Sequence, residues 1–134
     1  MRTTRNRERG AYVYFMTNRC DSVIYIGVTN DLLRRVAEHK LGMGGFTARY
    51  RCTKLVYFEA GDSISDAVAR EKQLKNWRRA WKNRLVSESN PGWVDLGPRI
   101  GLSAELLARI ATDSAFGGEE DAPASCLEDG SAVS

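Results

Sequence analysis

The chain has 134 residues, which is enough for one small domain and too few for two ordinary ones. Its three cysteines are an odd number without CxxC or Cys/His spacing, which argues against a disulfide framework and a structural zinc site. The basic N-terminal segment lacks the apolar stretch of a secretory signal, and no apolar run reaches the roughly 20 residues of a membrane span. We therefore expect a soluble, cytoplasmic protein with no membrane partner.

The net charge of +3 conceals a strong asymmetry along the chain. Residues 1–100 hold 19 Lys and Arg against 10 Asp and Glu, a balance of +9. Residues 101–134 hold one Arg against seven acids, a balance of −6. A basic body suits a polyanionic partner, because neutralising phosphates releases condensed counterions. A solvated basic surface without such a partner is the other interpretation of the charge alone.

The first part of the chain predicts a β-hairpin followed by a helix. Residues 1–10 are interpreted as a flexible basic arm. Two runs rich in aromatic and β-branched residues follow, AYVYFMT and SVIYIGV, and the polar NRCD between them is typical of a hairpin. Asn30 and Asp31 offer capping side chains for a helix over 31–40, and GMGGF ends that helix.

The second part predicts one more strand and several helices. KLVYFEA is the strand, and the helical pattern from Ser63 to about Val86 predicts two helices with a bend near residues 77–79. NPG at 90–92 is a stop signal, SAELLARIA predicts a short amphipathic helix, and the acidic segment after it is expected to be disordered. The predicted fold class is α+β, a small three-stranded antiparallel sheet flanked by helices in the order β-β-α-β-α-α.

Three tyrosines are expected to share one face of the hairpin. A turn between its two runs places Tyr14 opposite Tyr25, and Tyr12 opposite Gly27. Paired residues share a face, so the tyrosines would form an aromatic patch, with Gly27 leaving a gap beside it. A sheet face packed on a helix explains the same pattern, although buried phenol hydroxyls would then need partners.

The helix over 31–40 points two unusual side chains at the domain. Leu32 and Val36 define its buried stripe, since residues four apart lie ~40° apart around a helix. Arg35 and His39 lie on or beside that stripe, whereas Arg34 lies on the opposite side and faces solvent. A lone inward histidine is usually a satisfied core residue, but with an inward arginine one turn away it is more typical of a polar site.

The next helix carries a carboxylate inside its apolar stripe. Burying Glu71 there costs several kcal/mol unless it is paired, protonated or bound to a metal. An ion pair with Arg35 is the structural alternative to a metal ligand or a general acid or base. The apolar residues predicted around it are Ile64, Ala67, Val68 and Leu74.

These motifs together resemble the GIY-YIG nuclease family. YVY at 12–14, ten intervening residues and YIG at 25–27 match its two defining elements, with Tyr12 in place of the first glycine. DLLRRVAEH, GFTARY, AREKQLKNW and SNPGW follow in the order of the family's supporting motifs. The resemblance covers residues 11–95, which would form the nuclease domain, with a short helix and an acidic tail over 96–134. It is closest to the small stand-alone endonuclease branch.

The resemblance implies a role for each inward polar residue. Glu71 resembles the single metal-binding glutamate, which would hold one Mg²⁺ or Mn²⁺ with waters completing the shell. Arg35 resembles the arginine that clamps the scissile phosphate, and Tyr14 the tyrosine that orients or deprotonates the attacking water. Tyr25 and His39 resemble residues that hold the phosphate and nucleophile in line. No small-molecule cofactor is implied.

The expected partner is DNA, and RNA stays open. Trp77 and Trp81 could stack on bases, but packing on the sheet is the simpler interpretation. No appended specificity domain is evident, so recognition of DNA structure is favoured over recognition of sequence. A nucleic-acid-binding module without catalysis and a purely structural domain remain alternatives. The basic residues expected to contact the nucleic acid are Arg49, Arg51, Lys54, Lys72, Lys75, Arg78, Arg79 and Lys82.

Overall fold

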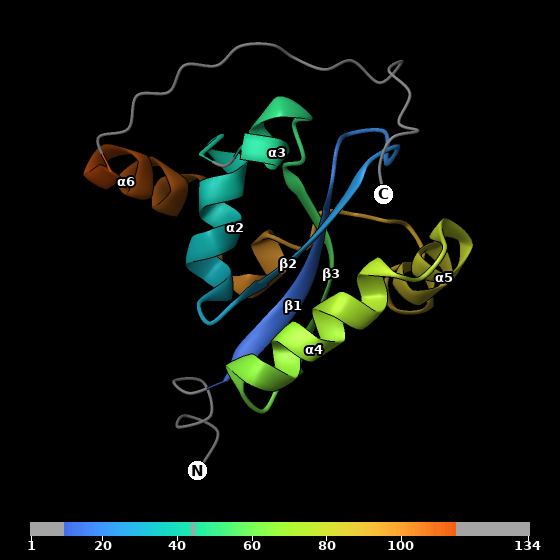
Figure 1. Ribbon diagram of the computed structural model, residues 1–134. Coiled ribbons are helices and arrows are strands. Elements are labelled where there is room, and N and C mark those ends of the chain that lie inside the picture. Colours follow the sequence, from blue (N-terminus) through green and yellow to red (C-terminus); the bar gives the residue numbers. More distant parts are fainter. Residues whose placement is uncertain (1–9, 44, 115–134) are drawn as a thin grey trace.

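A three-stranded antiparallel sheet forms the centre of the protein (Figure 1). The structure, a computed structural model, describes residues 10–43 and 45–114. The sheet order is β2-β1-β3, so the first strand is the central one. The strands are β1 (Ala11–Thr17), β2 (Ile24–Thr29) and β3 (Lys54–Gly61).

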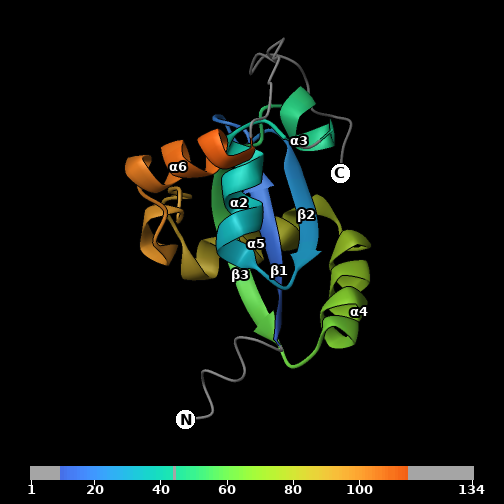
Figure 2. The ribbon, with the colours of Figure 1, turned by 90° about the vertical axis from the view of Figure 1, so that its left-hand side faces the viewer.

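Helices cover both faces of this sheet (Figure 2). The helices α2 and α6 pack on one face, and α4 and α5 pack on the other. The α+β class and the predicted element order are confirmed, with two short helices, α3 and η1, in addition. The helices are α2 (Leu32–Lys40), α3 (Gly45–Arg49), α4 (Ile64–Lys75), α5 (Arg79–Ser89), the 3₁₀ helix η1 (Pro98–Ile100) and α6 (Ala104–Ser114).

Side-chain caps begin α2 and α4, and the cap of α2 is Asp31, one of the two residues predicted for it. The Asp31 side chain accepts a hydrogen bond from the Arg34 backbone N–H at the start of α2. Ser63 does the same for Asp66 at the start of α4. Each cap satisfies one of the backbone donors that a helix leaves unpaired at its N-terminus. No helix within the described residues is long and apolar enough to cross a membrane.

The hairpin register differs from the predicted one by two residues. Tyr14 pairs with Gly27, and Tyr25 pairs with Met16. The predicted pairing of Tyr14 with Tyr25 was therefore wrong, because the turn is centred one residue later than expected. A shift of two residues keeps every side chain on its own face of the sheet. The aromatic face was thus predicted correctly, and the position of its glycine was not.

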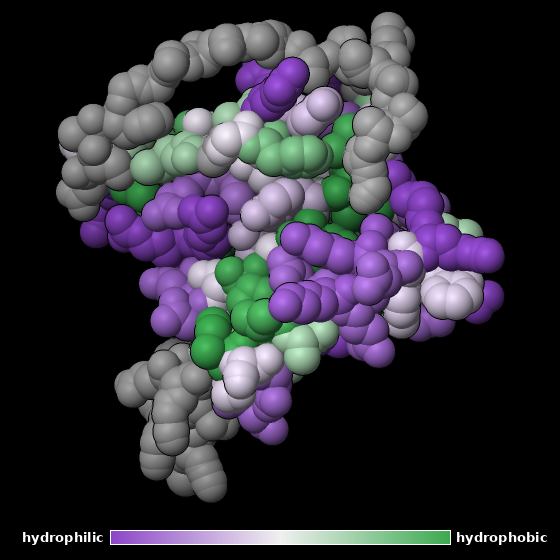
Figure 3. All heavy atoms as spheres, viewed as in Figure 1, coloured by the Kyte–Doolittle hydropathy of each residue, from purple (hydrophilic) through white to green (hydrophobic). Residues whose placement is uncertain are grey.

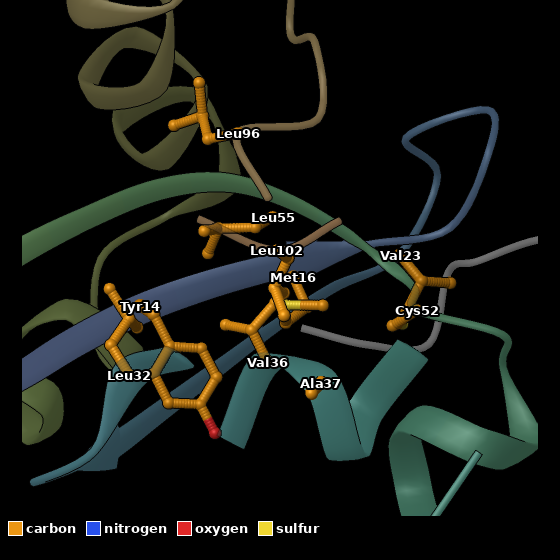
Figure 4. Packing of buried hydrophobic residues seen from close by; sticks show 10 residues of the cluster. All are labelled: Tyr14, Met16, Val23, Leu32, Val36, Ala37, Cys52, Leu55, Leu96 and Leu102. Atoms are coloured by element: carbon orange, nitrogen blue, oxygen red, sulfur yellow. The ribbon is translucent and has the colours of Figure 1, made fainter. Parts of the chain in front are cut away.

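The sheet separates two apolar clusters. On one face Tyr14 and Met16 pack against Leu32 and Val36 of α2 (Figure 4). The other face packs on α4 and α5, where Ala67 and Leu74 contribute the buried apolar side chains of α4. The chain therefore has two thin cores on either side of a single sheet. The strands alternate their side chains between them, except at the register shift of β3, where Val56 and Tyr57 both face the α4 side.

The predicted apolar stripe of α4 was wrong for two residues. Ile64 is 48% exposed and Val68 is 36% exposed, and apolar atoms show on the surface over α4 in Figure 3. The helix instead turns the side that carries Ala67, Leu74 and Arg70 toward the sheet, where the Arg70 guanidinium pairs with Glu59 of β3 at 2.5 Å.

Candidate active site

A chain of hydrogen bonds lies between the sheet and α2. The Tyr14 hydroxyl lies 2.8 Å from Nε2 of His39, and Nδ1 of His39 lies 2.8 Å from Oγ1 of Thr47. All three residues are buried, and Figure 4 shows the Tyr14 hydroxyl pointing toward α2. The chain therefore joins β1 to α2 and α3, which follow it further along the sequence.

Gly27 makes the room that the Tyr14 ring needs. A Cβ atom at Gly27 would lie 2.5 Å from the Tyr14 hydroxyl oxygen and 2.9 Å from Cε2 of Tyr25. Both distances are shorter than van der Waals contact allows, so no side chain fits there without displacing the rings. The gap predicted beside the aromatic patch exists, and the Tyr14 phenol fills it. This gives a steric reason for the glycine of YIG.

The burial of this chain sets its protonation states. Burial raises the pKa of Tyr14, and the neighbouring Arg35 charge opposes that rise only in part. Burial and the same arginine lower the pKa of His39 to about 4. At neutral pH the phenol thus keeps its proton and the imidazole is neutral. We assign the Tyr14 O–H as donor to Nε2, which leaves the Nδ1–H of His39 to donate to Thr47.

Arg35 lies at the edge of this buried chain and is accessible. Its side chain is 38% exposed, and Nη1 donates to Oε1 of Glu38 at 2.7 Å. Arg34 is 53% exposed and pairs with the same carboxylate from the outer side. The prediction that Arg34 faces solvent while His39 faces the domain is confirmed. The Arg35 charge acts on the Tyr14 phenol, and the Arg35 side chain is still exposed enough to reach a ligand. A group that binds phosphate requires such access.

Tyr25 completes the aromatic surroundings of the histidine. Its ring centroid lies 5.4 Å from that of His39 in an edge-on arrangement and 6.2 Å from that of Tyr14. Tyr25 is partly exposed, whereas Tyr14 is 1% exposed. Four of the five predicted catalytic residues, Tyr14, Tyr25, Arg35 and His39, therefore gather on one face of the sheet.

Glu71 is the fifth predicted residue, and it lies on α4, which packs on the opposite face. Its carboxylate pairs with Lys75 at 3.0 Å, and its side chain is 17% exposed. Among the described residues, the ionic partner of Arg35 is Glu38 and that of Glu71 is Lys75. The alternative of a buried Arg35–Glu71 ion pair was therefore wrong.

A metal ion at Glu71 would have to be held largely by water. The described residues contain no cluster of three or more His, Cys, Asp or Glu side chains that could enclose a metal ion. A single carboxylate is nevertheless a normal protein ligand for Mg²⁺, which keeps several of its waters. Glu71 is the residue that would hold such an ion.

The basic residues predicted to bind nucleic acid occupy different environments. Arg49, Arg51, Lys72 and Arg78 are exposed. Lys54 pairs with Asp21, and Lys75 pairs with Glu71. Arg79 is used within the fold, and Lys82 is buried by it.

The N-terminal half of α5 turns two of its cations inward. Arg79 donates to the backbone carbonyls of Asp21 and Ser22 and to the Asn83 side chain, so its guanidinium ties α5 to the hairpin turn. Lys82 is 4% exposed, and the expectation that it contacts nucleic acid at the surface was wrong. Residues 79, 82 and 86 share the helix face that packs on the sheet, which explains both positions.

Sequence reasoning missed two residues that support the site. Thr47 lies inside the GFTARY motif, and its buried hydroxyl is the partner of His39. Glu38 holds Arg35, and its position three residues later on the same helix was a readable signal. Asn90 of SNPGW is buried, and its amide donates to the carbonyls of Val56 and Val94, so it fixes the chain after α5.

Comparison with known proteins places these features in a family. The GIY-YIG catalytic domain matches residues 10–84. A UPF0213 protein of Natronomonas pharaonis is 42% identical over 78 residues, which cover 58% of this chain and 91% of that protein. A UPF0213 protein of Pediococcus pentosaceus is 36% identical over 85 residues, covering 62% of this chain and 90% of that protein.

A solved structure is also similar. The solution NMR structure of a UPF0213 protein from Bacillus halodurans shares 32% sequence identity, covers 63% of this chain and 89% of that chain, and has a TM-score of 0.42. The matched residues 10–84 contain all five predicted catalytic residues, Tyr14, Tyr25, Arg35, His39 and Glu71. The chain therefore belongs to the GIY-YIG catalytic-domain family and carries a nuclease domain of that type.

Proposed function

We propose that this protein is a metal-dependent endonuclease that hydrolyses phosphodiester bonds in DNA and selects DNA structure rather than sequence. The observation that carries the proposal is the buried Tyr14–His39–Thr47 chain with the accessible Arg35 at its edge. This arrangement holds the guanidinium cation of Arg35 in a fixed position beside the neutral, well-ordered hydroxyl groups of the chain. Fixed charge beside a developing negative charge is an efficient way to stabilise a phosphoryl-transfer transition state.

The residues divide the work according to their accessibility. Arg35 binds the non-bridging oxygens of the scissile phosphate, and its hydrogen bond from Nη1 to Glu38 fixes the guanidinium. Tyr25, which is partly exposed, orients the attacking water. Tyr14 stays protonated and positions Arg35 and His39, because its burial makes the phenolate costly. Mg²⁺ or Mn²⁺ held by Glu71, when bound, supplies Lewis-acid stabilisation of charge.

Plasmid nicking in Mg²⁺ and Mn²⁺ tests this proposal. Supercoiled, branched and single-stranded DNA are incubated with wild type, Arg35→Ala and Glu71→Gln. Each variant has a matched control with the same change at an exposed position, Arg34→Ala for the first and Glu88→Gln for the second. We expect Arg35→Ala and Glu71→Gln to lose at least about 100-fold in rate, by analogy with single electrostatic groups in other active sites. Cleavage that survives in both would overturn the assignment.

A binding module with the same fold is the second candidate. The observation that favours it is the position of Glu71, whose ionic partner is Lys75 on its own helix rather than a group of the Tyr14 site. Under this candidate, wild type binds DNA with strong salt dependence but does not nick it in either metal. The same assay therefore separates the two candidates.

A further inference from the structure

A row of aromatic rings extends from the candidate active site to the surface. The Tyr25 and Phe46 ring centroids are 5.7 Å apart with an interplanar angle of 32°. The Phe46 and Tyr50 centroids are 4.7 Å apart at 40°. Phe46 is 41% exposed, although it is a large apolar side chain. The row begins at Tyr25, which contacts His39, and passes through the exposed Phe46 to the partly buried Tyr50.

The helix that carries this row is anchored in the site. Thr47 follows Phe46 directly on α3 and is 1% exposed, with its hydroxyl bonded to His39. The adjoining surface is open, since a Cβ atom at Gly42 or Gly45 would meet nothing within 4 Å. The fold thus fixes the position of Phe46 relative to Tyr25 and His39.

Cations accompany the exposed rings. The Arg49 guanidinium carbon lies 5.5 Å from the centroid of the Tyr50 ring. Arg51 is exposed at the end of the same segment and adopts a φ of 56°, a left-handed conformation that arginine seldom takes. Within residues 10–43 and 45–114, neither arginine pairs with a carboxylate, so both charges are available to phosphates. Packing of α3 alone would not require two unpaired cations beside an exposed ring.

We propose that Phe46 and Tyr50, with Arg49 and Arg51, form a stacking site for an unpaired base of the DNA strand next to the scissile phosphate. The inference rests on the proposed function and adds its substrate class, which is DNA with unpaired nucleotides, such as a flap, a branch or a free end. Aromatic faces stack on any base, so the site confers preference for single strands without reading sequence. The positive charges hold the adjacent phosphates.

Equilibrium binding without divalent metal tests the stacking site apart from cleavage. The probes are a fluorescent single strand of about 12 thymidines, an abasic strand of equal length and phosphate number, and a duplex. We expect wild type to bind the thymidine strand about five- to tenfold more tightly than the abasic strand. Phe46→Leu keeps an apolar side chain but has no ring, and it should lose this preference while its duplex affinity stays the same.

Two further variants keep the test decisive. Phe46→Trp restores a ring and should restore the preference for bases. Trp81→Leu removes another exposed aromatic ring, which lies on α5 against the opposite face of the sheet, and it should have no effect. Thermal melting checks that each variant is folded. If Phe46→Leu retains the base preference, or if only Trp81→Leu loses it, the stacking site is overturned.

The outcomes also separate this inference from the proposed function. Nicking that depends on Arg35, without any preference for bases over the abasic strand, would overturn the stacking site alone. Base-dependent binding that requires Phe46, without any nicking, would support the stacking site and overturn the endonuclease. If wild type binds none of the three probes, the stacking site fails, and the nicking assay alone decides the endonuclease.

Discussion

At the scale of single residues, His39 shows how burial fixes a chemical state. Its ring contacts Tyr14 and Tyr25, both nitrogens have hydroxyl partners, and the charge of Arg35 lies nearby. The carboxylate of Glu38 favours the protonated ring but is outweighed by burial and by the arginine. The histidine therefore serves as a neutral link between two hydroxyl groups rather than as a cation for phosphate.

This state predicts a specific acid sensitivity. The unfolded chain takes up a proton on histidine near pH 6.5, whereas the folded chain does so only near pH 4. The unfolded state therefore binds more protons between these values, and the free energy of unfolding falls as the pH is lowered through this window. We expect a loss of roughly 3 kcal/mol by pH 4 from this group, measured by urea denaturation at several pH values.

The matched control removes the titrating group. His39 is the single histidine of the chain, so His39→Asn should abolish most of the pH dependence between 6.5 and 4.5 while lowering stability overall. Carboxylates contribute mainly below this range. Parallel pH profiles for wild type and variant would show that His39 is not the responsible group.

Lys82 presents the opposite situation, a buried charge without compensation. The residue is 4% exposed, and its ammonium has no hydrogen-bonding or ionic partner among the residues that the structure describes. Burial lowers its pKa, and the charges of Arg79 and Lys75 lower it further. Removing an unpaired ammonium from water is costly, whereas the four-carbon stem packs well.

Lys82→Met is expected to raise the free energy of unfolding by roughly 1–2 kcal/mol at pH 7. Because the pKa is lower in the folded state, wild type gains stability as the pH rises toward the unfolded value. The advantage of the variant should therefore shrink by pH 9.5. Urea denaturation at both pH values measures it, with Lys72→Met at an exposed position as control. A destabilised Lys82→Met protein would mean that the ammonium has a partner in solution.

At the scale of elements, the hairpin and α2 build the site through one close approach. The register that pairs Tyr14 with Gly27 brings the phenol over the glycine and onto Nε2 of His39. With any side chain at Gly27, the ring would have to move. The glycine therefore acts by leaving space, and not through an unusual backbone conformation.

Gly27→Ala tests this steric requirement. We expect destabilisation of roughly 1–3 kcal/mol, since the new methyl group would overlap the Tyr14 ring. The broken Tyr14–His39 hydrogen bond should also expose the imidazole and raise the pKa of His39, which is measured by NMR titration. Gly92→Ala is the control, because a Cβ there makes an ordinary 3.5 Å contact with Val94. Unchanged stability and His39 titration in Gly27→Ala would contradict the role of the gap.

The same elements show what the sequence could predict. Alternation along strands and the helical period placed Tyr14, Arg35 and His39 on their correct sides, because these patterns depend on local geometry alone. The hairpin register depends on the turn, whose NRCD sequence contains no strong turn signal, and it was predicted two residues away. The exposure of Ile64 and Val68 depends on how α4 lies against the sheet, which no local pattern contains.

At the scale of the whole molecule, one sheet divides the proposed machinery. Tyr14, Arg35 and His39 lie on the α2 face, and the helix that carries Glu71 packs on the other face. β2 is an edge strand, so DNA that contacts both groups would have to pass around this edge. The charge distribution around the sheet is therefore important for DNA binding. The nicking rates of Arg35→Ala and Glu71→Gln measure the contributions of the two faces separately.

The charge asymmetry of the sequence leads to the last prediction. Residues 115–134 hold five acidic residues and no Lys or Arg. Their charge lowers the net positive charge that attracts DNA, and such long-range effects are strongest at low salt.

A full-length variant with all five acids changed to their amides should therefore bind duplex DNA several-fold more tightly at 50 mM salt. The difference should vanish near 300 mM, where the Debye length is about 6 Å. Fluorescence anisotropy across this salt range measures it, with the same number of exposed serines and threonines changed to alanine as control. Equal affinities at low salt would show that these charges do not compete with DNA.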